Sequence, residues 1–309
     1  MAKLLDDRTP KVADTWGLGQ GAEIDDSLVA LALLGTGSRY EVYRAWDRRL
    51  FCEVAAKVIR PHRVEEDRVL EGFDREVGVA SRLQHPNLVR FLRWSSAPPR
   101  PYMVLEFIRA QTVAEHLDEN GPVSIPETCL LGVRTCSALH YLHSNYVLHL
   151  DVKPDNVTMG DPPRLLDFSL AQPVAGPVRL RHTVGTPAYM PPEQCDHGVV
   201  TPASDLFSLG VTLYEALSGL RPFSAGEENA TEKSAEYPQL VEDAQPLGDV
   251  MDLPRELERV IMACLQRDPQ RRPRSAIDVA VALHGVLEAL RVEELYAWPR
   301  GVRVRPDPP

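Results

Sequence analysis

The sequence predicts an α+β fold in which a group of short strands precedes a longer, mainly helical part. Apolar runs bounded by Gly, Asp or Pro occupy the first third of the chain, a pattern typical of strands. Beyond about residue 120, apolar residues recur at helical spacing. The chain has 309 residues and is 44% hydrophobic. It can therefore bury a large core, and its length allows two domains or lobes.

Composition and charge disfavour several classes of protein. The formal net charge of −10 argues against a nucleic-acid binder or a protein that binds anionic membranes, and slightly favours basic partners. The five cysteines are scattered without a C-x-x-C pair, so they predict neither a zinc site nor a disulfide framework, and a reducing cytoplasm is expected. We expect no signal peptide, because Asp6 and Asp7 interrupt the N-terminal apolar residues, and no membrane segment in this chain.

The expected elements follow in chain order. Residues 1–27 combine aspartates and glycines without a sustained period, which predicts a flexible or loosely docked extension. Helices are expected over residues 67–83 and 127–143, where apolar residues recur at helical spacing. Five strands are expected, over residues 28–34, 41–46, 54–59, 88–94 and 102–107.

Two features of the strand-rich part indicate phosphate binding. Gly35 and Gly37 lie between the first two strands, where the lack of a Cβ lets backbone N–H groups approach a phosphate. Lys57 is the one charged residue at the centre of an apolar strand, and such a lysine is costly to bury unless it is paired. Glu76 on the following helix is the expected partner, although a solvated helix face is the alternative interpretation of its charge.

One loop in the helical part carries three groups suited to phosphoryl transfer. In residues 149–156, Asp151 could accept the proton of an attacking hydroxyl and Lys153 could neutralise a migrating phosphoryl group. Asn156 could supply an oxygen to Mg²⁺. A polar turn is the alternative interpretation of this cluster when it is taken alone.

Together with the glycine-containing loop, five segments occur in the order and spacing found in protein kinases, and the chain resembles that family. Residues 149–156 resemble the catalytic loop H-R-D-x-x-x-x-N, and residues 167–169 resemble the metal-binding D-F-G motif. The remaining similar segments are residues 185–193 (G-T-x-x-Y-x-x-P-E), 205–210 (the start of the central helix) and 268–273 (D-P-x-x-R-P). The compact loops are similar to those of the eukaryotic-like Ser/Thr kinases of bacteria.

The resemblance implies a bilobal kinase domain over residues 28–290. A small lobe of five antiparallel strands and one main helix would span residues 28–105, and a hinge would span residues 106–110. A larger, mainly helical lobe would span residues 111–290, and residues 291–309 would form an extension or linker.

The resemblance also implies where ATP and its metal would bind. Lys57 and Glu76 would form the ion pair that positions the phosphates. Asn156 and Asp167 would hold Mg²⁺, with Mn²⁺ as an alternative metal. The residues implied to contact the nucleotide are Gly35, Gly37, Val42, Ala55, Lys57, Leu105, Glu106, Ile108 and Thr158.

Residues around the phosphate acceptor have further implied roles. Asp151 would deprotonate the substrate hydroxyl and Lys153 would stabilise the transferring charge, and Lys153 together with Thr186 points to Ser/Thr acceptors on protein substrates. The implied activation and substrate segment contains Thr183, Thr186 and Glu193, and the implied structural residues are Asp205, which would brace the catalytic loop, and Arg272, which would pair with Glu193.

Three departures from the family pattern leave alternatives open. Tyr40 replaces the third glycine of the phosphate loop, Leu150 replaces the arginine before the catalytic aspartate, and Ser169 replaces the glycine of D-F-G. Leu150 cannot pair with a phosphate, so we expect activity that does not depend strongly on phosphorylation of Thr183. A pseudokinase that serves as a scaffold is the main alternative, whereas residues 185–193 disfavour a small-molecule phosphotransferase.

Acidic residues are concentrated between residues 223 and 253. They predict a solvated face or, as the sharper alternative, a docking surface for a basic substrate or partner. Asp155 adds a weak preference for basic residues before the acceptor. The sequence leaves the oligomeric state open.

Overall fold

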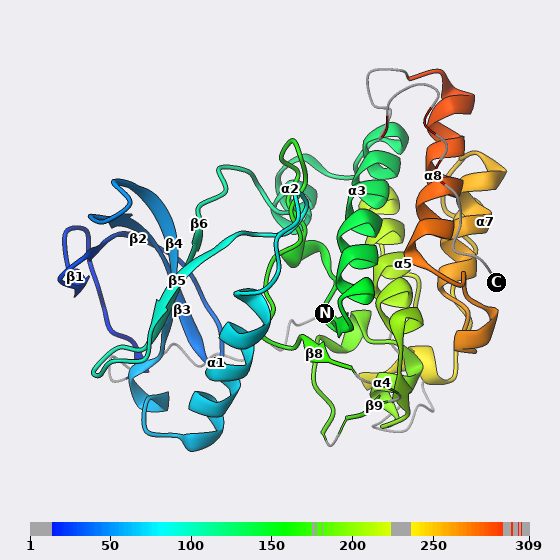
Figure 1. Ribbon diagram of the computed structural model, residues 1–309. Helices are drawn as coiled ribbons and strands as arrows, with labels where there is room; N and C mark the ends of the chain where they lie inside the picture. The colour runs from blue at the N-terminus through cyan, green and yellow to red at the C-terminus, as the bar shows by residue number, and fades with distance from the viewer. Residues whose placement is uncertain are drawn as a thin grey trace, which may run out of the picture. The chain divides into compact units, whose positions relative to one another are not determined.

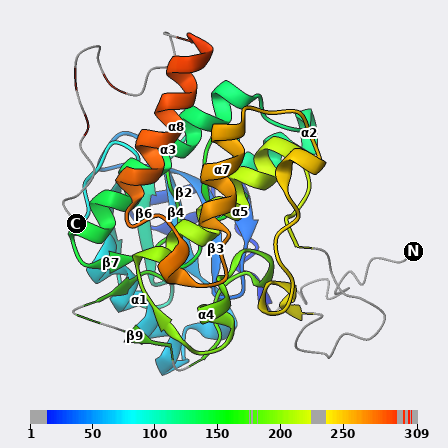
Figure 2. The ribbon, with the colours of Figure 1, turned by 90° about the vertical axis from the view of Figure 1, so that its right-hand side faces the viewer.

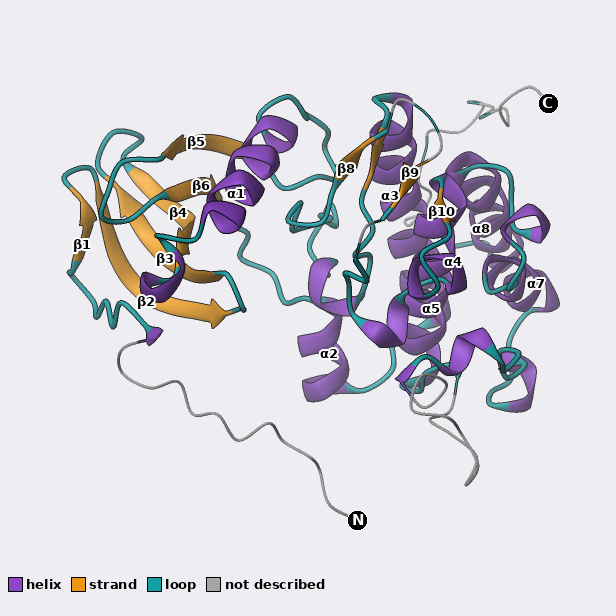
Figure 3. Cartoon of the chain, turned by 90° about the horizontal axis from the view of Figure 1, so that it is seen from below, coloured by secondary structure: helices purple, strands orange, loops and turns teal. Residues whose placement is uncertain are grey.

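The computed structural model describes residues 14–174, 176, 178–180, 182–223, 236–292, 298, 302 and 304. The chain divides into two compact units. The first comprises the described residues up to Leu83 together with Arg90–Arg109, and the second comprises Gln84–Val89 together with the described chain from Ala110 onward. The long strands lie in the first unit, and most of the helices lie in the second (Figure 3).

The first unit is a six-stranded antiparallel sheet with one long helix, α1 (Asp67–Ala80), beside it (Figure 1). The strand order is β1-β2-β3-β4-β6-β5. The strands are β1 (Glu23–Asp25), β2 (Leu28–Thr36), β3 (Tyr40–Asp47), β4 (Cys52–Ile59), β5 (Phe91–Ser95) and β6 (Tyr102–Glu106), and a 3₁₀ turn spans Pro61–Arg63. All five predicted strands are present, with boundaries that differ by a few residues.

The sheet has six strands rather than the predicted five because residues before Leu28 add one. Strand β1 pairs antiparallel with β2, with Glu23 opposite Val29. Upstream, the Trp16 indole N–H donates a 2.7 Å hydrogen bond to the carbonyl oxygen of Ile59, so the described part of the expected extension is docked on the sheet. A strand of three residues is too short to produce a recognisable alternation. The rest of that expected extension, residues 1–13, lies outside the described residues.

The two faces of this sheet are both packed. Alternate residues point to opposite faces. One face carries a buried cluster that includes Tyr43, Val54 and Tyr102, and Trp16 packs against it. On the other face, Tyr40 and Met103 pack with the apolar side of α1.

The second unit is mainly helical. Its helices are α2 (Val113–Asn120), α3 (Ile125–Ser144), α4 (Pro192–Cys195), α5 (Pro202–Ser218), α7 (Arg255–Cys264) and α8 (Ala276–Leu290). Short strands form two pairs, β7 (Val147–Leu148) with β8 (Gln172–Pro173), and β9 (Val178–Arg179) with β10 (Val199–Val200). The 3₁₀ turns span Pro154–Asn156, Pro187–Tyr189, Pro238–Leu240, Leu247–Asp249 and Pro269–Arg271. Within the described residues, none of the helices combines the length and the apolar character that a membrane span requires.

Helices α3, α5, α7 and α8 lie side by side in this unit (Figures 1 and 2). Glycine allows two of the close approaches. A Cβ at Gly132 of α3 would lie 2.5 Å from Cδ1 of Leu283 on α8, and a Cβ at Gly210 of α5 would lie 2.7 Å from Cβ of Cys264 on α7. Helix α5 begins at a Thr201 capping box and ends at Gly219, which adopts a φ of 70°. The packing of α5 against its neighbouring helices holds in place the chain segments that come before and after α5.

Candidate active site

The first unit holds a buried ion pair on the sheet face covered by α1. Lys57 lies on β4, and its Nζ is 2.6 Å from Oε1 of Glu76 on α1. Both side chains are buried. A buried ammonium group needs such a partner, because losing either charge would leave the other desolvated and unpaired.

Tyr40 contacts both members of this pair. Its hydroxyl donates a 2.9 Å hydrogen bond to Oε2 of Glu76, and Nζ of Lys57 lies 4.5 Å from the centroid of the Tyr40 ring. The carboxylate of Glu76 therefore binds Lys57 through one oxygen and Tyr40 through the other. In the sequence, Tyr40 stands out only as the residue that replaces a glycine, and no sequence pattern signals this contact.

Three of the predicted nucleotide residues share a sheet face with Lys57. Val42 lies opposite Lys57 in the ladder between β3 and β4, and Ala55 lies opposite Leu105 in the ladder between β4 and β6. The strand alternation puts these side chains on one face. They provide an apolar surface next to the charged group.

The remaining predicted nucleotide residues of this unit lie at its strand ends. Gly35, near the end of β2, and Gly37, in the turn before β3, are both exposed, and the Gly37 N–H donates to the carbonyl oxygen of Tyr40. Glu106 ends β6, and its Oε1 accepts a hydrogen bond from the backbone N–H of Arg90. Ile108 follows as a half-buried residue.

In the second unit, the structure brings Asp151, Lys153 and Thr186 into one hydrogen-bonded group. The Lys153 ammonium lies 3.0 Å from Oδ2 of Asp151 and donates a 2.7 Å hydrogen bond to the Thr186 hydroxyl. That hydroxyl donates to Oδ1 of Asp151 over 3.2 Å. A carboxylate that can accept a proton therefore lies directly beside a positive charge and a hydroxyl group.

Asn156 and Asp167 are neighbours of this group. The Asn156 carboxamide nitrogen donates to the carbonyl oxygen of Asp151 at 2.8 Å and to Asp151 Oδ2 at 3.0 Å. The carboxamide oxygen of Asn156 is thus the atom available to a cation. The Leu166 N–H donates to the backbone oxygen of Asn156, and Asp167 is the next residue along the chain from this contact. One carboxamide and one carboxylate oxygen suit Mg²⁺, which binds few protein ligands and takes the others from water or phosphate.

Asp205 supports the backbone of the loop that contains residues 149–156. Its Oδ1 accepts the Leu150 N–H at 2.8 Å, and its Oδ2 accepts the His149 N–H at 3.0 Å and lies 2.8 Å from Nε2 of His143. Burial raises the pKa of the Asp205 carboxyl, but the hydrogen bond and charge of His143 and the contacts with His149 outweigh it, so the pKa lies below the ordinary aspartate value. These bonds hold Leu150 at a φ of 62°, a conformation that costs energy for a side chain of this size.

Glu193 and Arg272 form a bidentate buried pair. Nη1 of Arg272 lies 2.7 Å from Oε1 of Glu193, and Nη2 lies 2.8 Å from Oε2. The Ser204 hydroxyl also donates to Oε1 of Glu193, and the Arg272 Nε–H donates to the carbonyl oxygen of Gln266. The pair therefore ties α4 to the start of α5 and to the turn before α8.

Three other predicted residues have local partners. The Thr158 hydroxyl accepts a hydrogen bond from the Arg164 N–H over 2.9 Å, within the turn that follows the catalytic loop. Ser169 has no positive φ, and its N–H donates to Oδ1 of Asp167 over 2.9 Å, so serine is accommodated without backbone strain. The Thr183 hydroxyl lies 3.3 Å from Nε2 of His197.

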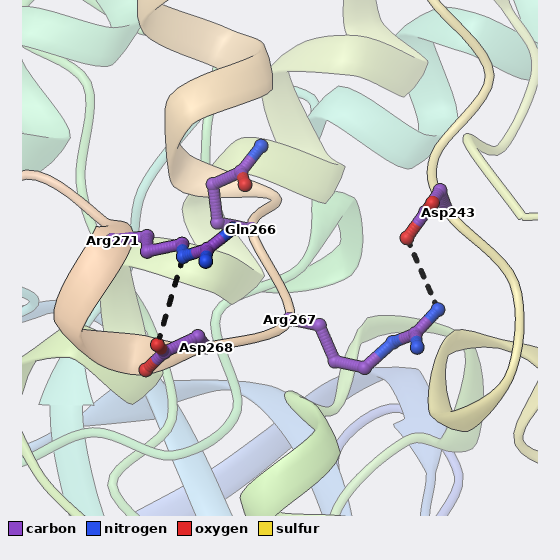
Figure 4. Close-up of a pocket in the computed structure, with 5 residues that line it drawn as sticks. All are labelled: Asp243, Gln266, Arg267, Asp268 and Arg271. Carbon is purple, nitrogen blue, oxygen red and sulfur yellow. Dashed lines mark hydrogen bonds and ion pairs between the residues drawn. The ribbon is translucent and has the colours of Figure 1, made fainter.

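Part of the predicted acidic surface is described. Glu227, Glu228, Glu232 and Lys233 lie outside the described residues. Asp243 is paired with Arg267 at 3.1 Å, at one side of a polar hollow of about 420 Å³ (Figure 4). The other lining residues are Gln266, Asp268 and Arg271. Both arginines lie beside a carboxylate, so the charges of this hollow are mutually compensated.

The comparison with known families agrees with this geometry. Residues 28–282 match the model of the protein kinase domain, and the chain therefore belongs to the protein kinase family. The residue groups described above fall within this match.

Several curated bacterial proteins are similar to the chain. The serine/threonine-protein kinase PrkC of Bacillus subtilis is 29% identical over 280 residues, which cover 89% of this chain and 42% of that protein. The serine/threonine-protein kinase PknB of Mycobacterium leprae is 31% identical over 261 residues, covering 81% and 41%. The DNA damage-responsive serine/threonine-protein kinase RqkA of Deinococcus radiodurans is 36% identical over 265 residues, covering 81% and 38%. The chain thus spans about two fifths of the length of these relatives.

Proposed function

We propose that this chain transfers the γ-phosphoryl group of ATP, with a divalent metal ion, to Ser or Thr hydroxyls of protein substrates. The observation that carries the proposal is the hydrogen-bonded group of Asp151, Lys153 and Thr186, with Asn156 and Asp167 beside it. Similarity to several bacterial serine/threonine-protein kinases supports the same activity.

Each residue of the second unit has a distinct role in this reaction. Asp151 accepts the proton of the substrate hydroxyl as that oxygen attacks the γ-phosphorus, the bond from this phosphorus to the β–γ bridging oxygen breaks, and ADP leaves. Lys153 stabilises the charge on the transferring group. Thr186 aligns Asp151 and Lys153 through its two contacts. Asn156 and Asp167 hold Mg²⁺, which when bound neutralises phosphate charge, and Mn²⁺ is the alternative metal.

The residues of the first unit bind the nucleotide. Lys57, oriented by Glu76, binds the α- and β-phosphates, and the loop with Gly35 and Gly37 covers them. The adenine base packs on Val42, Ala55 and Leu105, and the backbone of Glu106 to Ile108 binds its edge. Thr158, in the second unit, is the other residue for which the family resemblance implies a nucleotide contact. These assignments follow from the family and from the shared sheet face described above.

The proposed activity does not require phosphorylation of the activation segment. Leu150 is buried and offers no cation to a phosphate group. The weak preference for basic protein substrates that was expected from Asp155 remains part of the proposal.

A scaffold without phosphotransfer is the second candidate function. The Tyr40 ring against the Lys57 ammonium favours it, because the aromatic side chain occupies a position next to the group that binds phosphate. Retention of Lys57, Glu76, Asp151, Asn156 and Asp167 favours catalysis.

Transfer of radiolabelled γ-phosphate to a basic protein substrate distinguishes the two candidates. We expect transfer with Mg²⁺ or Mn²⁺, none after chelation, and label on Ser or Thr by phosphoamino-acid analysis. Asp151→Asn should lower the rate about 10²- to 10⁴-fold, whereas Asp161→Asn, at an exposed position after the loop, should not change it. Equal incorporation by wild type and Asp151→Asn would favour the scaffold.

A further inference from the structure

The activation segment packs on the catalytic loop through an apolar cluster. Leu148, Leu150 and Val200 form its buried part. The residues of the segment that pack against it are Leu170, Val174, Val178 and Leu180. Strands β9 and β10, which contribute Val178 and Val200 to this cluster, are paired with each other by backbone hydrogen bonds. Leu150, which replaces the arginine, thus contributes apolar packing at a position where other kinases pair that arginine with a phosphate group.

Gln194 adds a polar link between the same two segments. This residue lies on α4 and is 1% exposed. Its carboxamide nitrogen donates a 3.1 Å hydrogen bond to the carbonyl oxygen of Leu150 and a 2.6 Å hydrogen bond to that of Val184. One donor group therefore satisfies a carbonyl on each side of the contact, that of buried Leu150 and that of half-buried Val184, and leaving the Leu150 carbonyl unpaired would carry a desolvation cost.

Gly185 makes the close approach of Gln194 feasible. It adopts a φ of 128°, which side chains other than glycine rarely tolerate. A Cβ at this position would lie 2.7 Å from Nε2 of Gln194. The backbone at Gly185 and the carboxamide of Gln194 thus form one packed unit.

The two carbonyl groups held by Gln194 flank the catalytic contact. Leu150 immediately precedes Asp151, and Val184 lies two residues before Thr186, which donates to Asp151. We infer that Gln194 is a positioning residue that keeps Thr186 and the activation segment in register with Asp151 without a phosphate. This inference rests on the proposed kinase function and assigns the element that makes the segment independent of phosphorylation.

A second buried carboxamide provides a matched control. Gln239 is 2% exposed, and its nitrogen donates to the carbonyl oxygens of Pro187 at 2.7 Å and Met190 at 2.9 Å. It binds the same segment, but these bonds do not reach the catalytic loop. A merely structural role for Gln194 would make the two glutamines equivalent.

The test compares Gln194→Met with Gln239→Met, which both remove the donors while keeping side-chain length. In unphosphorylated protein, Gln194→Met should lower kcat at least tenfold and leave KM for ATP within about threefold, with faster hydrogen exchange in residues 170–174 and 182–186. Gln239→Met should lose comparable thermal stability while kcat changes less than about threefold.

Gln194→Glu gives a reading that does not depend on the methionine variant folding. A carboxylate cannot donate to the two carbonyl groups, whereas the protonated acid can donate to one. Burial at this 1% exposed position disfavours the charged form and should raise the pKa of the new carboxyl, so activity relative to wild type should rise at least threefold as the pH is lowered from 8 to 6. The inference is overturned if folded Gln194→Met keeps the wild-type kcat, or if folded Gln194→Glu is as active as wild type at pH 8.

The exchange experiment separates this inference from the proposed function. If the wild-type protein transferred no phosphate, the proposed function would fail. Faster hydrogen exchange in Gln194→Met than in Gln239→Met would still support a link by Gln194 between the activation segment and the catalytic loop. Equal hydrogen exchange in the two variants would overturn this role of Gln194, even with an active wild-type enzyme.

Discussion

The hydroxyl of Tyr40 donates a 2.9 Å hydrogen bond to Oε2 of Glu76, the same carboxylate that holds Lys57 through its other oxygen. A side chain at the position of a lost glycine thereby contacts the ion pair expected to bind phosphate. If the enzyme is active, Tyr40 helps to hold the carboxylate toward Lys57. If the protein is a scaffold, the same contact restrains Lys57 without any nucleotide.

Replacing Tyr40 by phenylalanine tests whether this hydrogen bond orients Glu76 in an active enzyme. The variant loses a hydrogen bond to a charged group but keeps the ring beside Lys57, so kcat/KM for ATP should fall about 3- to 20-fold. Tyr43→Phe is the matched control, because the Tyr43 hydroxyl is also bound to a glutamate, Glu41, but on the opposite sheet face. Steady-state kinetics measure both. Unchanged kcat/KM in Tyr40→Phe would show that the bond does not orient Glu76.

Thr183→Ala should keep at least a third of the wild-type transfer rate. Its hydroxyl contacts only His197 among the described hydrogen bonds, and the residue before Asp151 is leucine. The substitution Thr186→Ala, three residues later, should lower the transfer rate more than tenfold, because it removes the contacts with Asp151 and Lys153. The phosphotransfer rates of both variants are measured with phosphatase-treated protein. A large loss in Thr183→Ala would contradict activation without phosphate.

Arg272→Met should lower the free energy of unfolding of the helical unit by about 3–5 kcal/mol, because it leaves the buried Glu193 carboxylate unpaired. Arg271→Met, next along the chain, should cost less than about 1 kcal/mol, since its contact with Asp268 is exposed. Urea unfolding followed by circular dichroism measures the difference. Equal losses in the two variants would mean that the Glu193–Arg272 pair is not a main stabilising contact.

The Asp205 carboxyl should make stability depend on pH in the acid range. Its lowered pKa in the folded state means that its stabilisation is complete above the unfolded value near 4 and is lost as the pH falls through the folded pKa. The stability difference between wild type and Asp205→Asn should therefore shrink as the pH falls below about 4. Urea titrations at each pH measure it, and a difference that stays constant to pH 3 would refute the prediction.

Much of the fold could be predicted because its signals are local. The five predicted strands have a period-two pattern or an apolar centre with turn residues at both ends, and the helix at residues 127–143 has a clear helical period. The order of the short motifs predicted the kinase family, which the match over residues 28–282 confirms. These signals require no knowledge of which segments meet in space.

The contacts that were missed join residues far apart in the chain. Tyr40 and Glu76 are 36 residues apart, and Gln194 and Leu150 are 44 apart. A single tyrosine or glutamine carries no pattern that reveals its partner. Strand β1 was missed for a different reason, because three residues cannot establish a period. Its position also depends on the edge of β2 that does not pair with β3.

The contacts between the N-terminal segment and the sheet also determine how far the chain can be shortened from its N-terminal side. Beyond the pairing of β1, Gly21 donates to the carbonyl oxygen of Ala30, and Ala30 donates to that of Ala22. A protein starting at residue 28 would keep every residue proposed to bind ATP or metal, but the backbone of β2 near Ala30 would lose its partners. An open strand edge of this kind recruits strands from other molecules. We therefore expect such a shortened protein to aggregate with the residues proposed to bind ATP or metal intact, whereas one starting at residue 14, which keeps these hydrogen bonds, should remain monodisperse if the 309-residue protein does.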